Sequence, residues 1–102
     1  MTKLSCKVSP ELGAEITAIG IDMDIKKGKT LDYLVKLAVD NATFEKETYG
    51  TGETVSCTLQ MSEKKYTASK PYRLLHGLET KVAFLKDALE RGVSIHRSHN
   101  PK

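Results

Sequence analysis

The five residues LSCKV at positions 4–8 return as VSCTL at positions 55–59, with apolar, Ser, Cys, polar and apolar residues in the same order. Apolar and polar residues alternate in both stretches, which is the period of a half-buried β-strand. One strand alone leaves its N–H and C=O groups without ladder partners. The repeat therefore predicts an antiparallel pair of strands formed within one chain. The expected partners are Cys6 with Cys57, Leu4 with Leu59, and Val8 with Val55.

Two helices are expected after the first strand. Ser9 suits the N-cap of the first helix and Pro10 its first turn, and apolar residues follow at spacings of three and four. Gly28 is expected to end this helix and Thr30 to cap the next, which runs to about Ala42. The expected core faces are Leu12, Ile16, Ile19 and Met23 in the first helix, and Leu31, Leu34, Val35, Ala38 and Val39 in the second.

The middle of the chain is less regular. Residues 46–53, KETYGTGE, contain two glycines and no apolar periodicity, so they are expected to be a linker. A second strand is expected at residues 54–61. A helix capped by Ser69 would place Pro71 in its first turn, where proline is tolerated. Residues 62–68 are open between a loop, a short helical turn and a returning strand.

The last helix is expected to start at Thr80, because its pattern repeats that of the second helix at an offset of 50 residues. Gly92 is expected to end it, and residues 94–102 then form a basic tail. The chain is thus expected to be one structural domain made of a first unit, residues 1–45, and a second, degenerate unit, residues 54–93.

Composition restricts the class of protein. The chain of 102 residues has a net charge of +3 and ordinary globular composition, which permits a nucleic-acid partner without requiring one. No apolar run approaches the ~20 residues of a membrane span, and residues 1–11 lack the apolar core of a signal peptide. We therefore expect a cytoplasmic protein with no membrane partner. Its two cysteines are expected to be free, buried thiols.

No motif predicts an enzyme. The tripeptide at residues 28–30, GKT, ends like a P-loop, but Met23 stands where that loop requires glycine. His96 and His99 do not form a zinc-binding spacing with the two cysteines. No Ser/His/Asp arrangement or carboxylate pair is evident. We expect no catalytic residue, metal, cofactor or small-molecule substrate.

The order of features in residues 3–42 resembles the ribbon–helix–helix family of DNA-binding proteins, the Arc and methionine-repressor type. The matching segments are KLSCKVSPEL, the GKT turn at residues 28–30, and the apolar spacing at residues 34–39. Residues 54–92 match more loosely. The resemblance implies a mainly α fold with a short two-stranded antiparallel β-ribbon over four helices. Family members usually homodimerise to form it, whereas this chain would carry both units as a pseudo-dimeric tandem repeat.

The resemblance also implies a function, which is sequence-specific binding of double-stranded DNA with the ribbon in the major groove. Because the two strands differ, the DNA site is expected to be asymmetric. The role would be that of a transcriptional repressor, a relaxosome accessory protein or an autoregulating antitoxin of a bacterium, phage or plasmid. The base-contacting residues implied are Lys3, Ser5, Lys7, Ser56, Thr58 and Gln60, and the phosphate-contacting residues implied are Lys29, Thr30 and Thr80.

Simpler interpretations stay open: the polar strand face is a solvated surface, and the threonines are N-caps. A second hypothesis is a small protein-binding module, such as a phage-encoded inhibitor of a host enzyme. In it, residues 1–45 homodimerise through their strands, and residues 54–102 form a separate β-hairpin plus helix that contacts a partner protein. A monomer in solution favours the tandem, although self-association on DNA is compatible with it.

Overall fold

The computed structural model describes residues 1–99 of the chain. They form a mainly helical fold with one two-stranded antiparallel sheet, so the coarse fold class expected from the sequence is confirmed. No helix within residues 1–99 combines the length and the apolar character needed to cross a membrane. The elements are β1 (Thr2–Val8), α1 (Pro10–Met23), α2 (Lys27–Asp40), β2 (Val55–Met61), α3 (Glu63–Ala68), α4 (Lys70–Leu75) and α5 (Lys81–His99).

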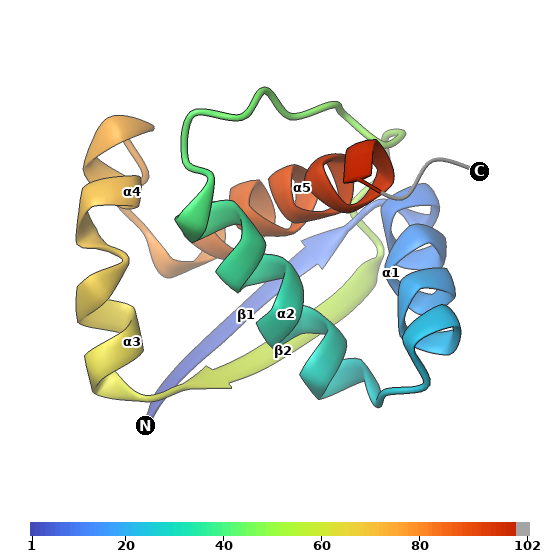
Figure 1. Ribbon diagram of the computed structural model, residues 1–102, viewed down its shortest axis with the longest axis horizontal. Coiled ribbons are helices and arrows are strands. Elements are labelled where there is room, and N and C mark those ends of the chain that lie inside the picture. Colours follow the sequence, from blue (N-terminus) through green and yellow to red (C-terminus); the bar gives the residue numbers. More distant parts are fainter. Residues whose placement is uncertain (100–102) are drawn as a thin grey trace.

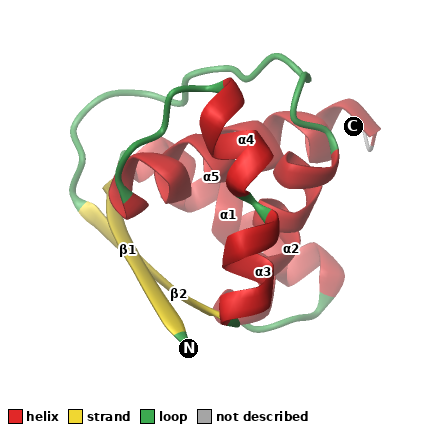
Figure 2. Ribbon diagram, turned by 90° about the vertical axis from the view of Figure 1, so that its left-hand side faces the viewer, coloured by secondary structure: helices red, strands yellow, loops and turns green. Residues whose placement is uncertain are grey.

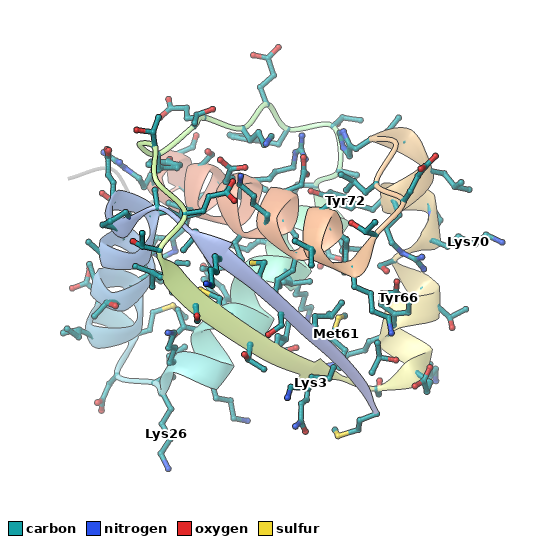
Figure 3. The ribbon with its side chains drawn as sticks, turned by 180° about the vertical axis from the view of Figure 1, so that it is seen from behind. Lys3, Lys26, Met61, Tyr66, Lys70 and Tyr72 are labelled. Carbon is teal, nitrogen blue, oxygen red and sulfur yellow. The ribbon has the colours of Figure 1, made fainter. Side chains whose placement is uncertain are left out.

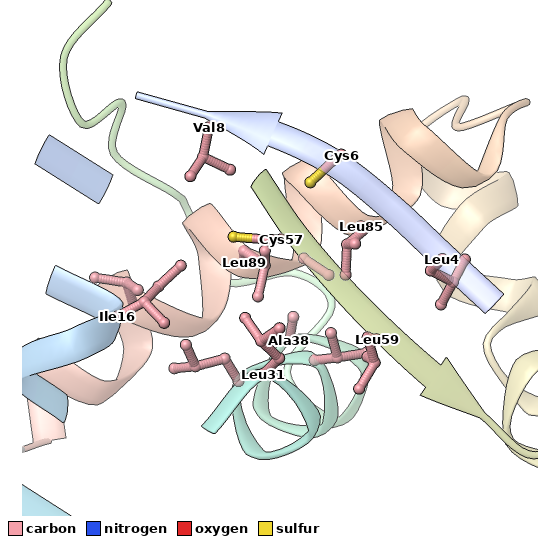
Figure 4. Close-up of a cluster of buried hydrophobic side chains, with 14 of the residues drawn as sticks. Leu4, Cys6, Val8, Ile16, Leu31, Ala38, Cys57, Leu59, Leu85 and Leu89 are labelled. Carbon is pink, nitrogen blue, oxygen red and sulfur yellow. The ribbon is translucent and has the colours of Figure 1, made fainter. Parts of the chain in front are cut away.

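The strand pairing has the predicted register. β1 and β2 run antiparallel with Cys6 opposite Cys57, and the pairs of Leu4 with Leu59 and Val8 with Val55 also follow. Because successive side chains alternate between the two faces of a strand, these apolar residues all point to one side. That side is the inner face of the sheet, where both thiols lie over the helices (Figure 4).

The helices cover only the inner face of the sheet (Figures 1 and 2). α2 and α5 cross beneath it and pack against each other at Gly92, where a Cβ atom would lie 2.3 Å from the carbonyl oxygen of Leu34. Glycine therefore permits a close approach of the two backbones. Buried apolar residues from both strands, α1, α2 and α5 form one hydrophobic cluster, which includes Leu4, Leu12, Ile16, Leu31, Leu34, Leu59, Phe84, Leu85 and Leu89.

The boundary between α1 and α2 differs from the sequence prediction. Asp24, with φ 54°, takes the left-handed conformation that ends α1, and aspartate tolerates this conformation better than most residues. α2 then begins at Lys27, so Gly28 lies inside a helix instead of ending one. Thr30 is not an N-cap: it is buried in α2, and its hydroxyl donates to the carbonyl oxygen of Lys26 at 3.0 Å. Met23, expected in the core, is exposed.

Residues 62–68 form a short helix, one of the three possibilities left open. The hydroxyl of Ser62 accepts a bond from the amide of Lys65 at 3.2 Å and caps α3. α4 follows with Ser69 at its N-cap position and Pro71 in its first turn, as predicted, but the side chain of Ser69 makes no capping bond. The two short helices stand beside the rest of the fold, and among their residues only Tyr72 of α4 is buried.

The prediction that Gly92 ends the last helix is wrong. α5 begins as expected after Thr80, whose hydroxyl accepts a bond from the amide of Ala83 at 3.1 Å, but it continues to His99. The first part of the expected tail, residues 94–99, is therefore helical, and Ile95 is fully buried. The remaining residues of that expected tail, 100–102, lie outside the described part of the chain.

The linker is anchored along its length, although it has no regular secondary structure, as predicted. Tyr49 is buried, and its carbonyl oxygen accepts a hydrogen bond from the hydroxyl of Ser9. The amide of Glu47 donates to the hydroxyl of Ser94 at 2.9 Å, and Lys46 forms an ion pair of 2.8 Å with Glu90. These contacts fasten the linker to α5 and to the start of α1.

A buried polar network lies where the linker, α4 and α5 meet. The guanidinium of Arg91 donates to the hydroxyl of Tyr72 at 2.7 Å, to the carboxylate of Asp87, and to the carbonyl oxygen of Phe44 at 2.7 Å. The hydroxyl of Tyr72 in turn donates to Asp87. Burial, followed by the bond to Asp87, raises the pKa of Tyr72. Buried charges need such partners, so this network holds α4 to the fold.

Candidate nucleic-acid interface

The outer face of the sheet is entirely polar. Strand alternation places six side chains there, all of them exposed, and these six residues are called the polar face. They are Lys3, Ser5, Lys7, Ser56, Thr58 and Gln60, the residues that the sequence singled out as base-contacting. No helix covers this face (Figure 3). The structure therefore brings all six together on one accessible surface.

Cross-strand pairing determines how the polar face is organised. Lys3 is opposite Gln60, and Lys7 is opposite Ser56. Between these pairs, the hydroxyls of Ser5 and Thr58 lie 3.0 Å apart in a hydrogen bond. The centre of the face thus carries two linked hydroxyls, and a lysine on β1 lies toward each end.

The lysines of the polar face have no compensating charge. Within residues 1–99, no carboxylate lies within ion-pair distance of Lys3 or Lys7. The only charged residues among the six are these two lysines. The face is therefore positive, and its other four members can both donate and accept hydrogen bonds.

The first turn of α2 lies at the edge of the polar face. The ammonium of Lys27 donates to the carbonyl oxygen of Ser56 in β2 at 3.1 Å. A shallow groove between α2 and β2 is lined by Lys26 and Lys29 from the helix and by Thr58 and Gln60 from the polar face, together with Met1, Gly28, Asp32, Leu59, Met61, Ser62 and Lys65. The start of α2 and the polar face therefore form one continuous surface.

This helix start is electrostatically unusual. Its N-cap residue is Lys26, which makes no side-chain capping bond, and its first turn holds no acidic residue. A helix N-terminus carries a partial positive charge, so Lys26, Lys27 and Lys29 each oppose it by about 0.3–1 kcal/mol at an exposed site. α1, by contrast, is capped by Ser9 and has an acid in its first turn. An anion would relieve the conflict at α2 by accepting bonds from the free amides.

The three residues predicted to contact phosphate differ in exposure and in hydrogen bonding. Lys29 is exposed in the first turn of α2. Thr30 is buried, and its amide and its hydroxyl both donate to the carbonyl oxygen of Lys26, so neither group is free to meet a phosphate in this conformation. The hydroxyl of Thr80 is engaged in capping α5, with Glu79 beside it in the sequence.

Sequence reasoning missed Lys26 and Lys27, which it placed at the C-terminal end of α1. There, cations would have been favourable with the helix dipole. The left-handed turn at Asp24 transfers them to the opposite pole of the next helix. Asp24 is a sequence signal for this boundary, because aspartate tolerates the left-handed conformation, but Gly28 and Thr30 are competing signals.

The two thiols of the inner face are shielded from reaction. Burial, with a smaller contribution from Cys57, raises the pKa of Cys6 to about 12, and burial also raises the pKa of Cys57. Both side chains are free cysteines, as expected. They act as small apolar residues beneath the sheet.

Known proteins give no direct guide to this site. No protein-family model, curated protein or solved structure matches the chain. Within residues 1–99, no group of three or more His, Cys, Asp or Glu side chains is placed to hold a metal ion. The proposals below therefore depend on the geometry and charge of the residues themselves.

Proposed function

We propose that this protein binds double-stranded DNA in a sequence-specific manner, as a transcriptional repressor or an accessory DNA-binding protein. The two strands enter the major groove with the polar face toward the base edges, and the start of α2 contacts the backbone. A two-stranded ribbon fits the major groove of B-DNA. The proposal includes a tandem ribbon–helix–helix architecture, with β1, α1 and α2 as one unit and β2, α3, α4 and α5 as the other.

One observation carries the proposal. In the described part of the chain, lysines with no carboxylate in ion-pair distance gather on one surface, from the strands and from the uncapped start of α2. Those at the start of α2 oppose the helix dipole. Such an arrangement destabilises the free protein locally, and a phosphate at α2 would stabilise it. A purely solvated face does not require Lys26, Lys27 and Lys29 at the positive pole of a helix.

The DNA site is expected to be asymmetric. Lys3 and Lys7 can donate to the O6 and N7 acceptors of guanine, whereas Gln60 can form a bidentate pair with adenine. All the lysines of the polar face are on β1, so the two strands present different chemistry. The preferred sequence should therefore lack the two-fold symmetry of an operator for a homodimer.

The test is selection of bound duplexes from a random pool, followed by affinity measurements at several salt concentrations. Each lysine that neutralises a phosphate adds about −0.9 to the log–log salt slope. About five or six such contacts predict a slope near −5. Failure to retain any duplex at low salt would refute the proposal.

Three matched substitutions separate the roles. Lys7→Ala should relax sequence preference, with a loss of about 1–3 kcal/mol on the selected site and little on random DNA. Lys29→Ala should weaken binding to all sequences and reduce the salt slope by about one. Lys36→Ala removes the same exposed charge two turns further along α2 and should change neither. Equal losses from all three variants would contradict the assignment.

The protein-binding alternative loses part of its structural basis. It required a separate β-hairpin in the second half, but β2 is a single strand that pairs with β1 over its whole length. In this hypothesis β1 pairs with β1 of a second copy, whereas in the structure it pairs with β2 of the same chain. A protein partner is still compatible with the fold, at a different surface.

A further inference from the structure

α4 leaves both of its leucines exposed to solvent. Its only buried residue is Tyr72, while Leu74 is 72% exposed and Leu75 is 58% exposed. Pro71 is exposed as well. Folding gains little from these side chains, because they remain in water. Adjoining exposed apolar residues on a small domain indicate a contact surface.

Arg73 beside them is held in place by neutral groups alone. Its guanidinium lies over the ring of Tyr66, 4.2 Å from the ring centre. Its Nε donates to the hydroxyl of Ser69 at 3.1 Å, and its Nη2 donates to the carbonyl oxygen of Tyr66 at 2.9 Å. No carboxylate of residues 1–99 lies within ion-pair distance of it.

This arginine is therefore oriented before any anion binds. A half-buried guanidinium without a counter-charge is unfavourable, and a carboxylate accepting a bond from it would form one of the stronger hydrogen bonds available to proteins. Its side chain is already ordered by Tyr66 and Ser69, so binding would cost little side-chain entropy.

A shallow cleft joins the arginine to the apolar residues. It is lined by Lys70, Arg73, Leu74, Gly77, Leu78 and Glu79. Gly77, with φ 64°, turns the chain after α4, and the amide of Leu78 donates to the carbonyl oxygen of Arg73 at 2.8 Å. Its lining thus contains two leucines and two cationic side chains but one acidic side chain, so the cleft is apolar and net positive.

We propose that this cleft binds an acidic, apolar segment of a partner protein. One carboxylate of the segment pairs with Arg73, a second is attracted by Lys70, and a leucine-like side chain packs against Leu74 and Leu78. The two leucines distinguish this ligand from nucleic acid, because a phosphate gains nothing from them. The inference does not rest on DNA binding.

The cleft and the polar face belong to different sides of the molecule. α3 and α4 face the viewer in Figure 2, whereas the sheet lies at its left-hand edge. In Figure 3, which looks onto the sheet, Lys70 of α4 points away to the right. A partner on α4 would therefore leave the polar face open, and one molecule can hold DNA and a protein together.

The experiment is an NMR titration of the ¹⁵N-labelled full chain with a synthetic amphipathic helical peptide composed of Glu and Leu. Resonances of residues 69–79 should shift and saturate. A peptide with Lys in place of Glu, and one with Ser in place of Leu, should each bind at least about tenfold more weakly.

Three variants locate the site. Leu74→Ser and Lys70→Glu should each weaken binding of the Glu/Leu peptide by about tenfold. Ile21→Ser is the matched control, because Ile21 on α1 is 74% exposed, like Leu74, and the affinity should not change. All three positions are exposed, so the variants should fold, which their spectra report.

Several results would overturn the proposal. They are the absence of shifts at millimolar peptide, shifts confined to other elements, and equal binding of the Lys/Leu peptide. Shifts of Arg73 and Lys70 with a DNA duplex that are insensitive to Leu74→Ser would assign the cations to nucleic acid. A concentration-dependent dimer abolished by Leu74→Ser in sedimentation would assign the cleft to a second copy of the chain.

Discussion

Replacing Gly92 with alanine should destabilise the fold, although alanine is the better helix former. Gly92 lies inside α5, where that helix crosses α2. A Cβ atom there would lie 2.3 Å from the carbonyl oxygen of Leu34, and 2.8 Å and 2.9 Å from its carbonyl carbon and Cα. Favourable contacts between heavy atoms lie near about 3.5–4.0 Å, so the two helices must separate by about 1 Å.

The magnitude follows from two opposing effects. Overpacking costs about 1–3 kcal/mol, and the upper end applies because the obstacle is backbone, which cannot rotate aside as a side chain can. Alanine recovers about 1 kcal/mol through its helix propensity. The net loss is therefore about 2 kcal/mol. For a domain of this size, that lowers the melting temperature by roughly 8–16 °C.

Thermal and urea unfolding followed by circular dichroism measure this effect. Gly28→Ala is the matched control, because Gly28 also lies in a helix but a Cβ there meets nothing within 4 Å. It should leave the melting temperature unchanged or raise it, by up to about 1 kcal/mol of added stability. If Gly92→Ala melted at or above the temperature of the unmodified chain, the close crossing of α2 and α5 would be refuted.

Three further outcomes are expected. The thiols of Cys6 and Cys57 should resist thiol reagents at pH 8 until the chain unfolds. Because burial raises the pKa of Cys6 from 9.0 to about 12, the stability contributed by the protonated thiol is complete below pH 9 and is lost as the pH rises toward 12. Urea unfolding between pH 8 and pH 12 tests this, and a free energy of unfolding that did not fall would contradict it. Tyr72→Phe removes the bond to Asp87 and should cost about 1–3 kcal/mol in urea unfolding; an unchanged midpoint would contradict the buried network. Ser9→Ala should cost about 1–2 kcal/mol by removing the α1 N-cap, and no loss in the same assay would exclude that role.

The sheet was predictable because its signal is local. Alternation identifies a strand and its faces, and the repeated Cys at the centre of LSCKV and VSCTL gave the register. The same alternation placed all six residues of the polar face correctly at the surface. The DNA contacts assigned to them are still predictions.

The start of α2 was not predictable, because several residues could mark it. The boundary between the two helices could lie at any of three residues. Asp24 and Gly28 both suit the C-terminal end of α1, Thr30 suits the N-cap of α2, and tertiary packing decides between them. Thr30 packs against the last turn of α1, where a Cβ at Gly20 would lie 2.7 Å from its hydroxyl oxygen. Thr30 is buried inside α2, and the uncapped start of the helix lies at Lys26.

Gly92 illustrates a second limit. Glycine ends helices, and it also permits two helices to approach closely. Only the position of Leu34 on α2 distinguishes these cases, and no periodicity within α5 contains that information. The cleft on α4 was missed for a similar reason, since Arg73 and Leu78 become neighbours only through the turn at Gly77.

Both strands of the sheet belong to one polypeptide, and the linker between them is fastened to α5. Strand pairing is therefore a first-order process, whereas a sheet assembled from two copies dissociates on dilution. A cell with a handful of molecules would hold the same fraction of paired strands as one with thousands. A single amino-acid substitution also changes an outward side chain of one strand and leaves the other strand unchanged. The outward side chains of β1 and β2 can therefore diverge during evolution.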